Sequence, residues 1–276
     1  MLRITSLQNG RIKQIVKLNN RRQRDACQQT VVEGSREVSR ALQHGLIPPE
    51  AYLCPDLLND ETAAAVTRLQ QLAASGQTQL FEITPEIFAK IAYRGDSGGL
   101  LLVIPYLQQS LHNLPLSANP FFAIIENVEK PGNLGAILRT ADAAGVDGVI
   151  VCSDGTASTD LHNPNVIRAS LGTLFAVPVA AAKTSETIDW LRTRGIQIVV
   201  ATPEAERLYT AVNLQTPVAL VTGSEAFGLS PQWLDAAAAQ VRIPMHGTAD
   251  SLNLATATAL LLYEVVRQRR SNGVIE

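Results

Sequence analysis

The sequence predicts an α/β protein in which a parallel sheet follows a smaller α/β domain. Apolar segments typical of strands alternate with helical patterns along most of the 276 residues, as they do in α/β folds. The runs at 196–200 and 218–221 are almost entirely apolar, which is expected of parallel strands covered on both faces. A stretch rich in Pro, Gln, Ser and Asn at 107–120 predicts a linker between a domain at 1–106 and a domain at 121–276.

The elements follow in chain order. In the first domain, short β-branched and aromatic runs bounded by turn residues, and helical periods ending at Gly45 or Gly76, predict strands at 31–34, 51–54, 80–83 and 100–104 and helices at 35–45, 60–75 and 85–92. In the second domain, the same reasoning predicts strands at 121–127, 148–152, 175–181, 196–201, 218–222 and 240–244. Helices are predicted there at 133–144, 164–172, 185–194, 231–239 and 251–270.

Composition excludes several classes of protein. With 46% hydrophobic and 17% charged residues, the chain can bury a core and is not intrinsically disordered. The formal net charge of -2 excludes a globally basic nucleic-acid binder but not a local basic patch. Cys27, Cys54 and Cys152 are unclustered, so neither a disulfide framework nor a zinc site is expected. No apolar run approaches the ~18 residues that span a bilayer, and residues 1–5 do not begin a signal peptide. We therefore expect a cytoplasmic protein that binds neither metal nor membrane.

Common catalytic and nucleotide-binding motifs are missing from the sequence. It contains no GxGxxG, GxxxxGK[ST] or HExxH string, and its four histidines have no metal-ligand spacing. The string at 95–99, Gly-Asp-Ser-Gly-Gly, resembles the nucleophile segment of trypsin-like proteases. The only upstream histidine, His44, lies on a predicted helix, so a catalytic triad around Ser97 is not supported. We expect a glycine-rich turn there.

Three segments after predicted strands combine polar residues with glycines. In 126–141, Asn133 follows a Pro-Gly turn and can cap a helix. Arg139 lies among small apolar residues, where burial of a guanidinium without an acidic partner would be costly. In 221–231, two glycines allow a ligand to approach the backbone closely. Glu225 stands there at the end of a strand, where open α/β sheets bind ligands.

The third segment covers 243–257. Ser251 is placed to cap the last helix, whereas Asn253 falls inside an otherwise apolar stretch of that helix. Capping explains Ser251 but not Asn253. Asn253 is therefore a candidate functional residue.

The N-terminus carries a basic segment. Residues 1–24 hold seven Lys and Arg side chains and no acid, and Lys13, Lys17, Arg21 and Arg24 follow the spacing of one helical stripe. The stripe is either a solvated helix face or an arm that contacts phosphates.

Taken together, the three segments resemble a known enzyme family. The strings N-x5-NLGAILRTA, VTGSEAFGL and IPM-x5-SLNLATA, in this order within 127–257, resemble motifs one, two and three of the SpoU (TrmH-like) group of SPOUT RNA methyltransferases. The segment 7–18 followed by 32–36 resembles the opening of the N-terminal substrate-binding domain of that group. The resemblance implies a C-terminal trefoil knot, which topology rules alone would not predict. It also implies a homodimer with sites near the subunit interface, and S-adenosylmethionine as cofactor.

The resemblance also implies roles for individual residues. Cofactor contacts are expected from Ala201, Thr202, Gly223, Ile243, Met245, Leu252 and Asn253. The catalytic group is expected to comprise Arg139 with Asn133 beside it. Glu225, Ser251 and Asn253 are expected to orient Arg139, the RNA or the cofactor. Because a guanidinium stays protonated at neutral pH, Arg139 is expected to bind an RNA phosphate and stabilise the alkoxide rather than act as a general base. RNA contacts are expected from Lys13, Lys17, Arg21, Arg24 and Arg168.

The expected activity is methylation of a ribose 2′-hydroxyl in large-subunit rRNA. The distinct N-terminal domain favours rRNA over the runner-up substrate, tRNA. Within this class the sequence does not separate a housekeeping enzyme from one that confers antibiotic resistance. An RNA-binding ribosome-assembly factor without catalysis is the alternative of a different class, and intact motif residues argue against it.

Overall fold

The chain divides into two compact units. The computed structural model describes residues 2–93, 97–107, 110–153, 160–224 and 227–270. Unit 1 comprises Met1–Gln108 and Asp160–Ala176, and unit 2 comprises Gln109–Thr159 and Val177–Glu276. The segment Asp160–Ala176, which the sequence-based boundary assigned to the second domain, therefore packs with the first. Within the described ranges, no helix is long and apolar enough to cross a membrane.

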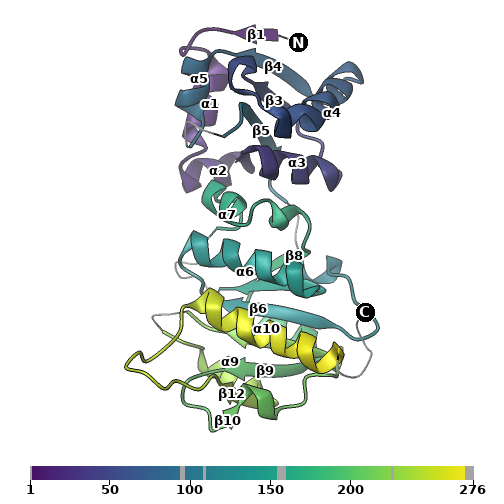
Figure 1. The fold of residues 1–276 in the computed structure, drawn as a ribbon, viewed down its shortest axis with the longest axis vertical. Coiled ribbons are helices and arrows are strands. Elements are labelled where there is room, and N and C mark those ends of the chain that lie inside the picture. The colour runs from purple at the N-terminus through teal and green to yellow at the C-terminus, as the bar shows by residue number, and fades with distance from the viewer. Residues whose placement is uncertain (1, 94–96, 108–109, 154–159, 225–226, 271–276) are drawn as a thin grey trace. The chain divides into compact units, whose positions relative to one another are not determined.

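Unit 1 is built on a five-stranded mixed sheet (Figure 1). Its order is β1-β4-β3-β5-β2, with β1, β4 and β3 parallel and β5 antiparallel to both β3 and β2. The strands are β1 (Leu2–Ile4), β2 (Gln29–Glu33), β3 (Glu50–Leu53), β4 (Gln79–Ile83) and β5 (Leu100–Pro105). The sequence analysis missed β1, because a three-residue edge strand is too short to show a period.

Helices cover the unit 1 sheet. They are α1 (Gly10–Lys17), α2 (Arg21–Cys27), α3 (Ser35–Gln43), α4 (Ala63–Ala74), α5 (Pro85–Ile91) and α7 (Pro164–Ala169), with 3₁₀ turns at Pro55–Leu57, Asp60–Thr62 and Thr173–Phe175. The apolar residues of α1 and α5, including Ile12, Ile15 and Phe88, share a buried cluster with Tyr52 and Phe81 from the sheet. One face of the sheet is thereby closed.

The basic stripe is not one helix, and Arg24 does not belong to its exposed surface. Helix α1 ends at Lys17, and α2 begins at Arg21 after the Asn20 cap. Arg24 is only 2% exposed. Its guanidinium donates to the carbonyls of Leu18 and Asn19, at 2.8 and 3.0 Å, between the two helices. This burial argues against the expected contact of Arg24 with RNA, whereas Lys13, Lys17 and Arg21 are exposed.

Arg24 also fixes the segment 160–176 to unit 1. Its Nη2 lies 2.8 Å from Oδ2 of Asp160, in a buried ion pair. His162 stacks on Tyr106 with ring centroids 3.7 Å apart, and its Nε2 accepts a hydrogen bond from the Leu107 amide. Burial lowers the pKa of His162 below its ordinary value, which favours the neutral ring that this bond requires.

Unit 2 contains a seven-stranded sheet in which every pair of neighbours is parallel, as expected. Its order is β10-β12-β9-β11-β6-β7-β8. The strands are β6 (Phe121–Glu126), β7 (Gly148–Cys152), β8 (Val179–Ala182), β9 (Gln197–Ala201), β10 (Arg207–Leu208), β11 (Val218–Thr222) and β12 (Ala239–Arg242). The two-residue edge strand β10 was not predicted.

Helices cover both faces of this sheet (Figure 1). They are α6 (Pro131–Ala144), α8 (Thr184–Arg192), α9 (Pro231–Ala236) and α10 (Leu254–Arg270), with 3₁₀ turns at Leu111–Asn113 and Tyr209–Ala211. Trp190 of α8 and Trp233 of α9 pack in one cluster with Phe122 and Val221. The next residue of β11, Thr222, points to the opposite face and lies 3.1 Å from the Thr258 hydroxyl of α10. Helix α10 in turn packs along α6.

Candidate active site

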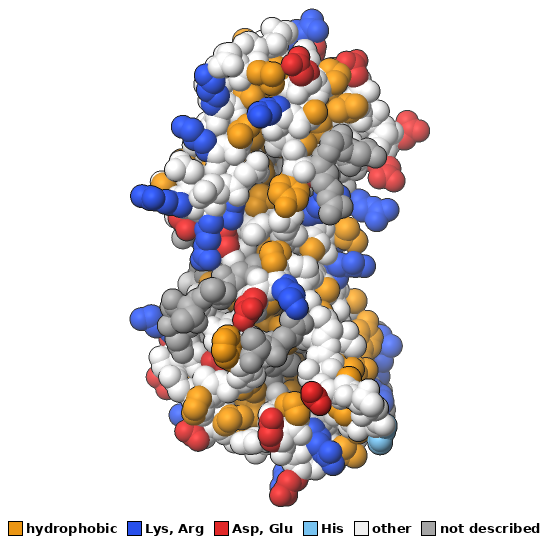
Figure 2. All heavy atoms as spheres, turned by 90° about the vertical axis from the view of Figure 1, so that its left-hand side faces the viewer, with side chains coloured by type: hydrophobic (Ala, Val, Ile, Leu, Met, Phe, Trp, Pro, Cys, Tyr) orange, Lys and Arg blue, Asp and Glu red, His pale blue; other side chains and the backbone are white. Residues whose placement is uncertain are grey.

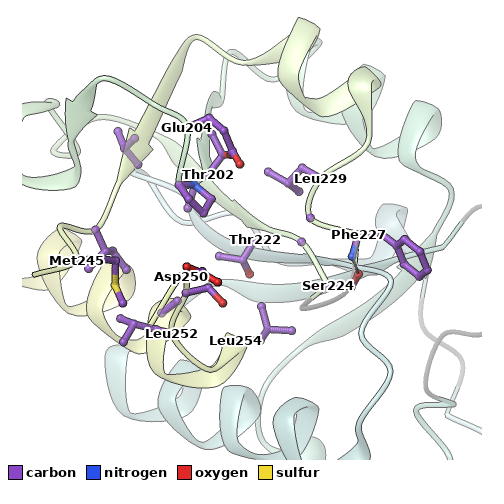
Figure 3. Close-up of a pocket in the computed structure, with 18 of the residues that line it drawn as sticks. Thr202, Glu204, Thr222, Ser224, Phe227, Leu229, Met245, Asp250, Leu252 and Leu254 are labelled. Atoms are coloured by element: carbon purple, nitrogen blue, oxygen red, sulfur yellow. Dashed lines mark hydrogen bonds between the residues drawn. The ribbon is translucent and has the colours of Figure 1, made fainter. Parts of the chain in front are cut away.

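A cavity of about 540 Å³ opens in unit 2 at the carboxyl ends of β9, β11 and β12 (Figure 3). Because these strands are parallel, the segments that follow them meet at one edge of the sheet. Three loops and the start of α10 form most of the wall. The lining residues are Ala201–Glu204, Thr222–Ser224, Phe227–Leu229, Leu234, Val241, Ile243, Met245, Asp250–Leu252, Leu254 and Ala257.

Most of the residues expected to contact a cofactor lie in this wall. Ala201 ends β9 and Thr202 follows it, Gly223 follows β11, and Ile243 and Met245 follow β12. Leu252 and Ser251 belong to the loop that precedes α10. Among the residues described, Asn253, Asn133 and Arg139 do not line the cavity.

The turn after β11 explains the glycine at 223. Ser224 and Gly228 form an isolated antiparallel bridge, and the Phe227 amide donates to the Ser224 hydroxyl at 3.1 Å. A Cβ on Gly223 would come within 2.1 Å of the Gly228 carbonyl oxygen, so the turn closes only with glycine there. The turn leaves Phe227 84% exposed at the rim, and Figure 3 shows its ring directed away from the cavity.

Asn253 links the third motif to the first. Its Nδ2 donates to Oδ1 of Asn133 over 3.1 Å. Asn253 is also the residue that caps α10, since its Oδ1 accepts from the amides of Ala255 and Thr256 at 3.1 and 3.4 Å. The expectation that Ser251 caps this helix and that Asn253 lies inside it was wrong, because the helix begins three residues later than expected, at Leu254. Capping therefore accounts for part of the role of Asn253.

Asn133 does not cap α6, contrary to the expectation from the sequence. Helix α6 begins at Pro131 with Lys130 as its N-cap residue, so Asn133 lies in the first helical turn. From there its side chain reaches the start of α10. The amide pair thus holds the beginnings of the two packed helices together.

Arg139 differs from its expected environment. We expected a guanidinium among small apolar residues to be buried, but the Arg139 side chain is exposed. Its neighbours Leu138 and Ile137 are buried, whereas Arg139 lies on the outer surface of α6. The cost of burying a guanidinium is therefore not a reason to assign Arg139 a function. Its exposed positive charge instead makes it a candidate for contact with the substrate. Glu225 lies outside the described residues.

Glu126, at the end of β6, was not among the predicted site residues. This carboxylate is 1% exposed and accepts from the Ser230 amide and hydroxyl, both at 2.7 Å, and from the Thr184 hydroxyl at 3.1 Å. It thereby ties the loop after β11 to β6 and to the start of α8. The sequence signal that could have identified it is a glutamate at the end of an otherwise apolar predicted strand.

The family of the chain follows from comparison with known proteins. Residues 120–263 match the SpoU rRNA Methylase family, and residues 9–101 match the MRM3-like substrate binding domain. This chain belongs to the SpoU rRNA methylase family. The SpoU match covers the unit 2 sheet, the described cavity-lining residues, helix α6 and the part of α10 up to residue 263.

Individual members of the SpoU family align with nearly the whole chain. The 23S rRNA (uridine(2479)-2′-O)-methyltransferase of Streptomyces viridochromogenes is 31% identical, over 98% of this chain and 93% of its own length. A crystal structure of an RNA 2′-O ribose methyltransferase is 40% identical, with a TM-score of 0.82 over 98% of this chain and 100% of that one. An AdoMet-bound rRNA methyltransferase from Sinorhizobium meliloti is 30% identical, with a TM-score of 0.85 over 96% of this chain and 97% of that one.

Substitution of Gly223 tests whether the turn shapes the cavity. Gly223→Ala should weaken S-adenosylmethionine binding at least tenfold, because the new methyl group would displace the Gly228 carbonyl. Binding is measured by isothermal titration calorimetry. Gly247→Ala is the matched control, since a Cβ there meets nothing within 4 Å. Equal affinities for the Gly223 variant and the control would show that the turn does not define the site.

Proposed function

We propose that this protein transfers a methyl group from S-adenosylmethionine to a ribose 2′-hydroxyl in large-subunit rRNA. The observation that carries the proposal is the cavity at the ends of β9, β11 and β12, walled by the segments that correspond to SpoU motifs two and three. The relative from Streptomyces viridochromogenes, which aligns over both units, is named for this reaction. The substrate-binding domain match at 9–101 supports a role of unit 1 in binding the substrate.

The cavity suits S-adenosylmethionine in size and in chemistry. Its volume lies within the range usual for sites that bind small molecules. The apolar side chains of Ile243, Met245, Leu252 and Leu254 would flank the adenine, and backbone groups near Gly223 would contact the ribose. The cofactor has no phosphate, so no phosphate-binding loop is required.

When bound, S-adenosylmethionine supplies an electrophilic methyl group on a sulfonium. Transfer exchanges the carbon–sulfur bond for a carbon–oxygen bond and releases the hydroxyl proton. The protein contributes mainly by fixing the cofactor and the ribose in line, and such positioning can lower a barrier by roughly 7–11 kcal/mol. The Asn133–Asn253 pair joins α6, which carries Arg139, to α10, whose start borders the cavity. It would therefore hold the RNA-binding group and the cofactor site in a fixed relative position.

In this mechanism Arg139 binds an RNA phosphate and stabilises the developing alkoxide. Its exposure suits contact with a large substrate, and no hydrogen bond or ion pair engages it among the described residues. A permanently charged guanidinium is a poor proton acceptor, so the proton passes to a phosphate oxygen or to water. Ser251, in the cavity wall, and Glu225 are assigned to orient the substrate or cofactor.

The RNA-binding surface of unit 1 is assigned to Lys13, Lys17 and Arg21. Arg168 is a weaker candidate, because its Nη1 lies 3.8 Å from the buried Glu33 carboxylate and its side chain is only one-third exposed. Figure 2 shows Lys and Arg side chains protruding from the surface of unit 1. Such cations give an acidic chain the local positive surface that RNA binding requires.

The proposal includes features of the SpoU fold and assembly. Gln268 forms hydrogen bonds with the Leu214 amide and the Val212 carbonyl, and Arg269 donates to the carbonyls of Asn119 and Thr216. These contacts anchor the end of α10 among earlier loops and support a trefoil knot, which an experimental chain trace would test.

Leu260 and Tyr263 are exposed one turn apart on α10. They support a homodimer, which a measurement of the molar mass in solution tests. A ribosomal substrate implies the cytoplasm, where cell fractionation should find the protein.

Two other functions remain distinguishable. A tRNA methyltransferase would use the same cavity, and only the RNA that accepts the methyl group separates it from the proposal. A non-catalytic assembly factor would not require the cofactor, so measurable S-adenosylmethionine affinity would argue against it.

Arg139 provides the direct test of the catalytic assignment. Arg139→Ala should abolish methyl transfer to rRNA while the dissociation constant for S-adenosylmethionine stays within about twofold, because Arg139 does not line the cavity. Arg139→Lys should also fail, since lysine lacks the planar guanidinium fork. Arg192→Ala, at the exposed end of α8, is the control. A loss of cofactor affinity as large as the loss of turnover would refute this role.

The unit 1 surface is tested by the salt dependence of RNA binding. Replacing Lys13, Lys17 and Arg21 together by glutamine should weaken binding and reduce the slope of log affinity against log salt concentration by roughly 2, because three phosphate contacts are lost. The control replaces Arg36, Arg68 and Arg192, which are exposed on other helices. An unchanged slope in the first variant, or an equal change in the control, contradicts the assignment.

A further inference from the structure

The described part of the cavity wall carries negative charge and no positive charge. Among its described lining residues the ionisable side chains are Glu204 and Asp250, with no Lys, Arg or His. Figure 3 shows the two carboxylates on different segments of the wall, Glu204 after β9 and Asp250 before α10. Both side chains remain accessible to solvent. A ligand in the cavity would therefore lie in the field of two carboxylates.

The Glu204 carboxylate is held in place. The Thr202 hydroxyl donates a hydrogen bond to it, and the Thr202 amide donates to the Val241 carbonyl of β12 at 2.9 Å. The hydrogen bond from Thr202 lowers the pKa of Glu204 below its ordinary value, so this group stays ionised at neutral pH. The loop after β9 thus presents a fixed negative charge to the cavity.

This charge pattern is unsuitable for RNA phosphates and suitable for a small cation. Two carboxylates repel a polyanion, so the backbone of the RNA would not enter the cavity. S-Adenosylmethionine carries a sulfonium, an ammonium and a carboxylate, which sum to +1 at neutral pH. Loss of the methyl group removes the sulfonium charge, and S-adenosylhomocysteine is neutral overall. The two carboxylates therefore attract S-adenosylmethionine by its net charge, and S-adenosylhomocysteine lacks this attraction.

We propose that Glu204 and Asp250 make the cavity selective for the cationic cofactor over its neutral product. The inference rests on the proposed function. The field of the two carboxylates favours S-adenosylmethionine before transfer and not S-adenosylhomocysteine after it, which assists product release. Because both groups face solvent, each charge should change the affinity ratio of the two ligands by about three- to tenfold.

The test compares ligands that differ in charge. Dissociation constants of the full chain for S-adenosylmethionine, S-adenosylhomocysteine and sinefungin are measured by calorimetry at low and high salt. Sinefungin carries an ammonium near the position of the sulfonium and has no methyl group to transfer, so it reports charge without reaction. The variants are Glu204→Gln, Asp250→Asn and the double substitution. Glu206→Gln removes the same charge two residues away, outside the described cavity wall, and thermal unfolding checks that each variant folds.

We expect each single variant to weaken S-adenosylmethionine and sinefungin by about three- to tenfold while S-adenosylhomocysteine changes less than twofold. Added salt should weaken the two cations in the wild type and not the neutral product. The inference is overturned if all three ligands weaken equally, if none weakens, or if Glu206→Gln has the same effect. Failure of the wild type to bind either S-adenosylmethionine or S-adenosylhomocysteine would instead overturn the proposed function and this inference with it.

Discussion

Three parallel strands of unit 2, β9, β11 and β12, end at one edge of the sheet, and the cavity is built on that edge. Parallel pairing places the loops after these strands side by side, although they lie far apart in the sequence. The loop after β11 reaches the cavity only as a closed turn, which requires glycine at 223. The carboxylate of Glu126 then fixes the end of that loop to β6. The backbone is thus positioned before any ligand binds, which is the preorganisation that an in-line transfer needs.

A second constraint connects this edge to the helices. The hydrogen bond between Asn253 and Asn133 joins the starts of α10 and α6, and Asn253 caps α10 at the same time. One side chain therefore sets where the last helix begins and couples it to the helix that carries Arg139. The exposed position of Arg139 on α6 fits a group that meets a large substrate, and the cavity beside the strand ends is the proposed cofactor site.

Much of this arrangement could be predicted from the sequence because it depends on local signals. Nearly continuous apolar runs indicated the positions of β9 and β11, and the second and third motifs led to the cavity residues Gly223, Ile243 and Leu252. Tertiary contacts decided the rest. Helical spacing favoured an exposed Arg24, but its partner Asp160 is 136 residues away and becomes a neighbour only in the fold. Similarly, Arg139 has apolar neighbours in sequence, yet the helix turns its side chain outward.

We propose above all that this chain methylates a ribose 2′-hydroxyl of rRNA with S-adenosylmethionine. The most direct measurement incubates the purified protein with labelled S-adenosylmethionine and, separately, with unmodified rRNA and tRNA, followed by digestion and mass spectrometry of the nucleosides. We expect label in a 2′-O-methylnucleoside from rRNA. Label confined to tRNA would contradict the substrate assignment, label on a base would contradict the chemistry, and absence of cofactor binding would contradict both.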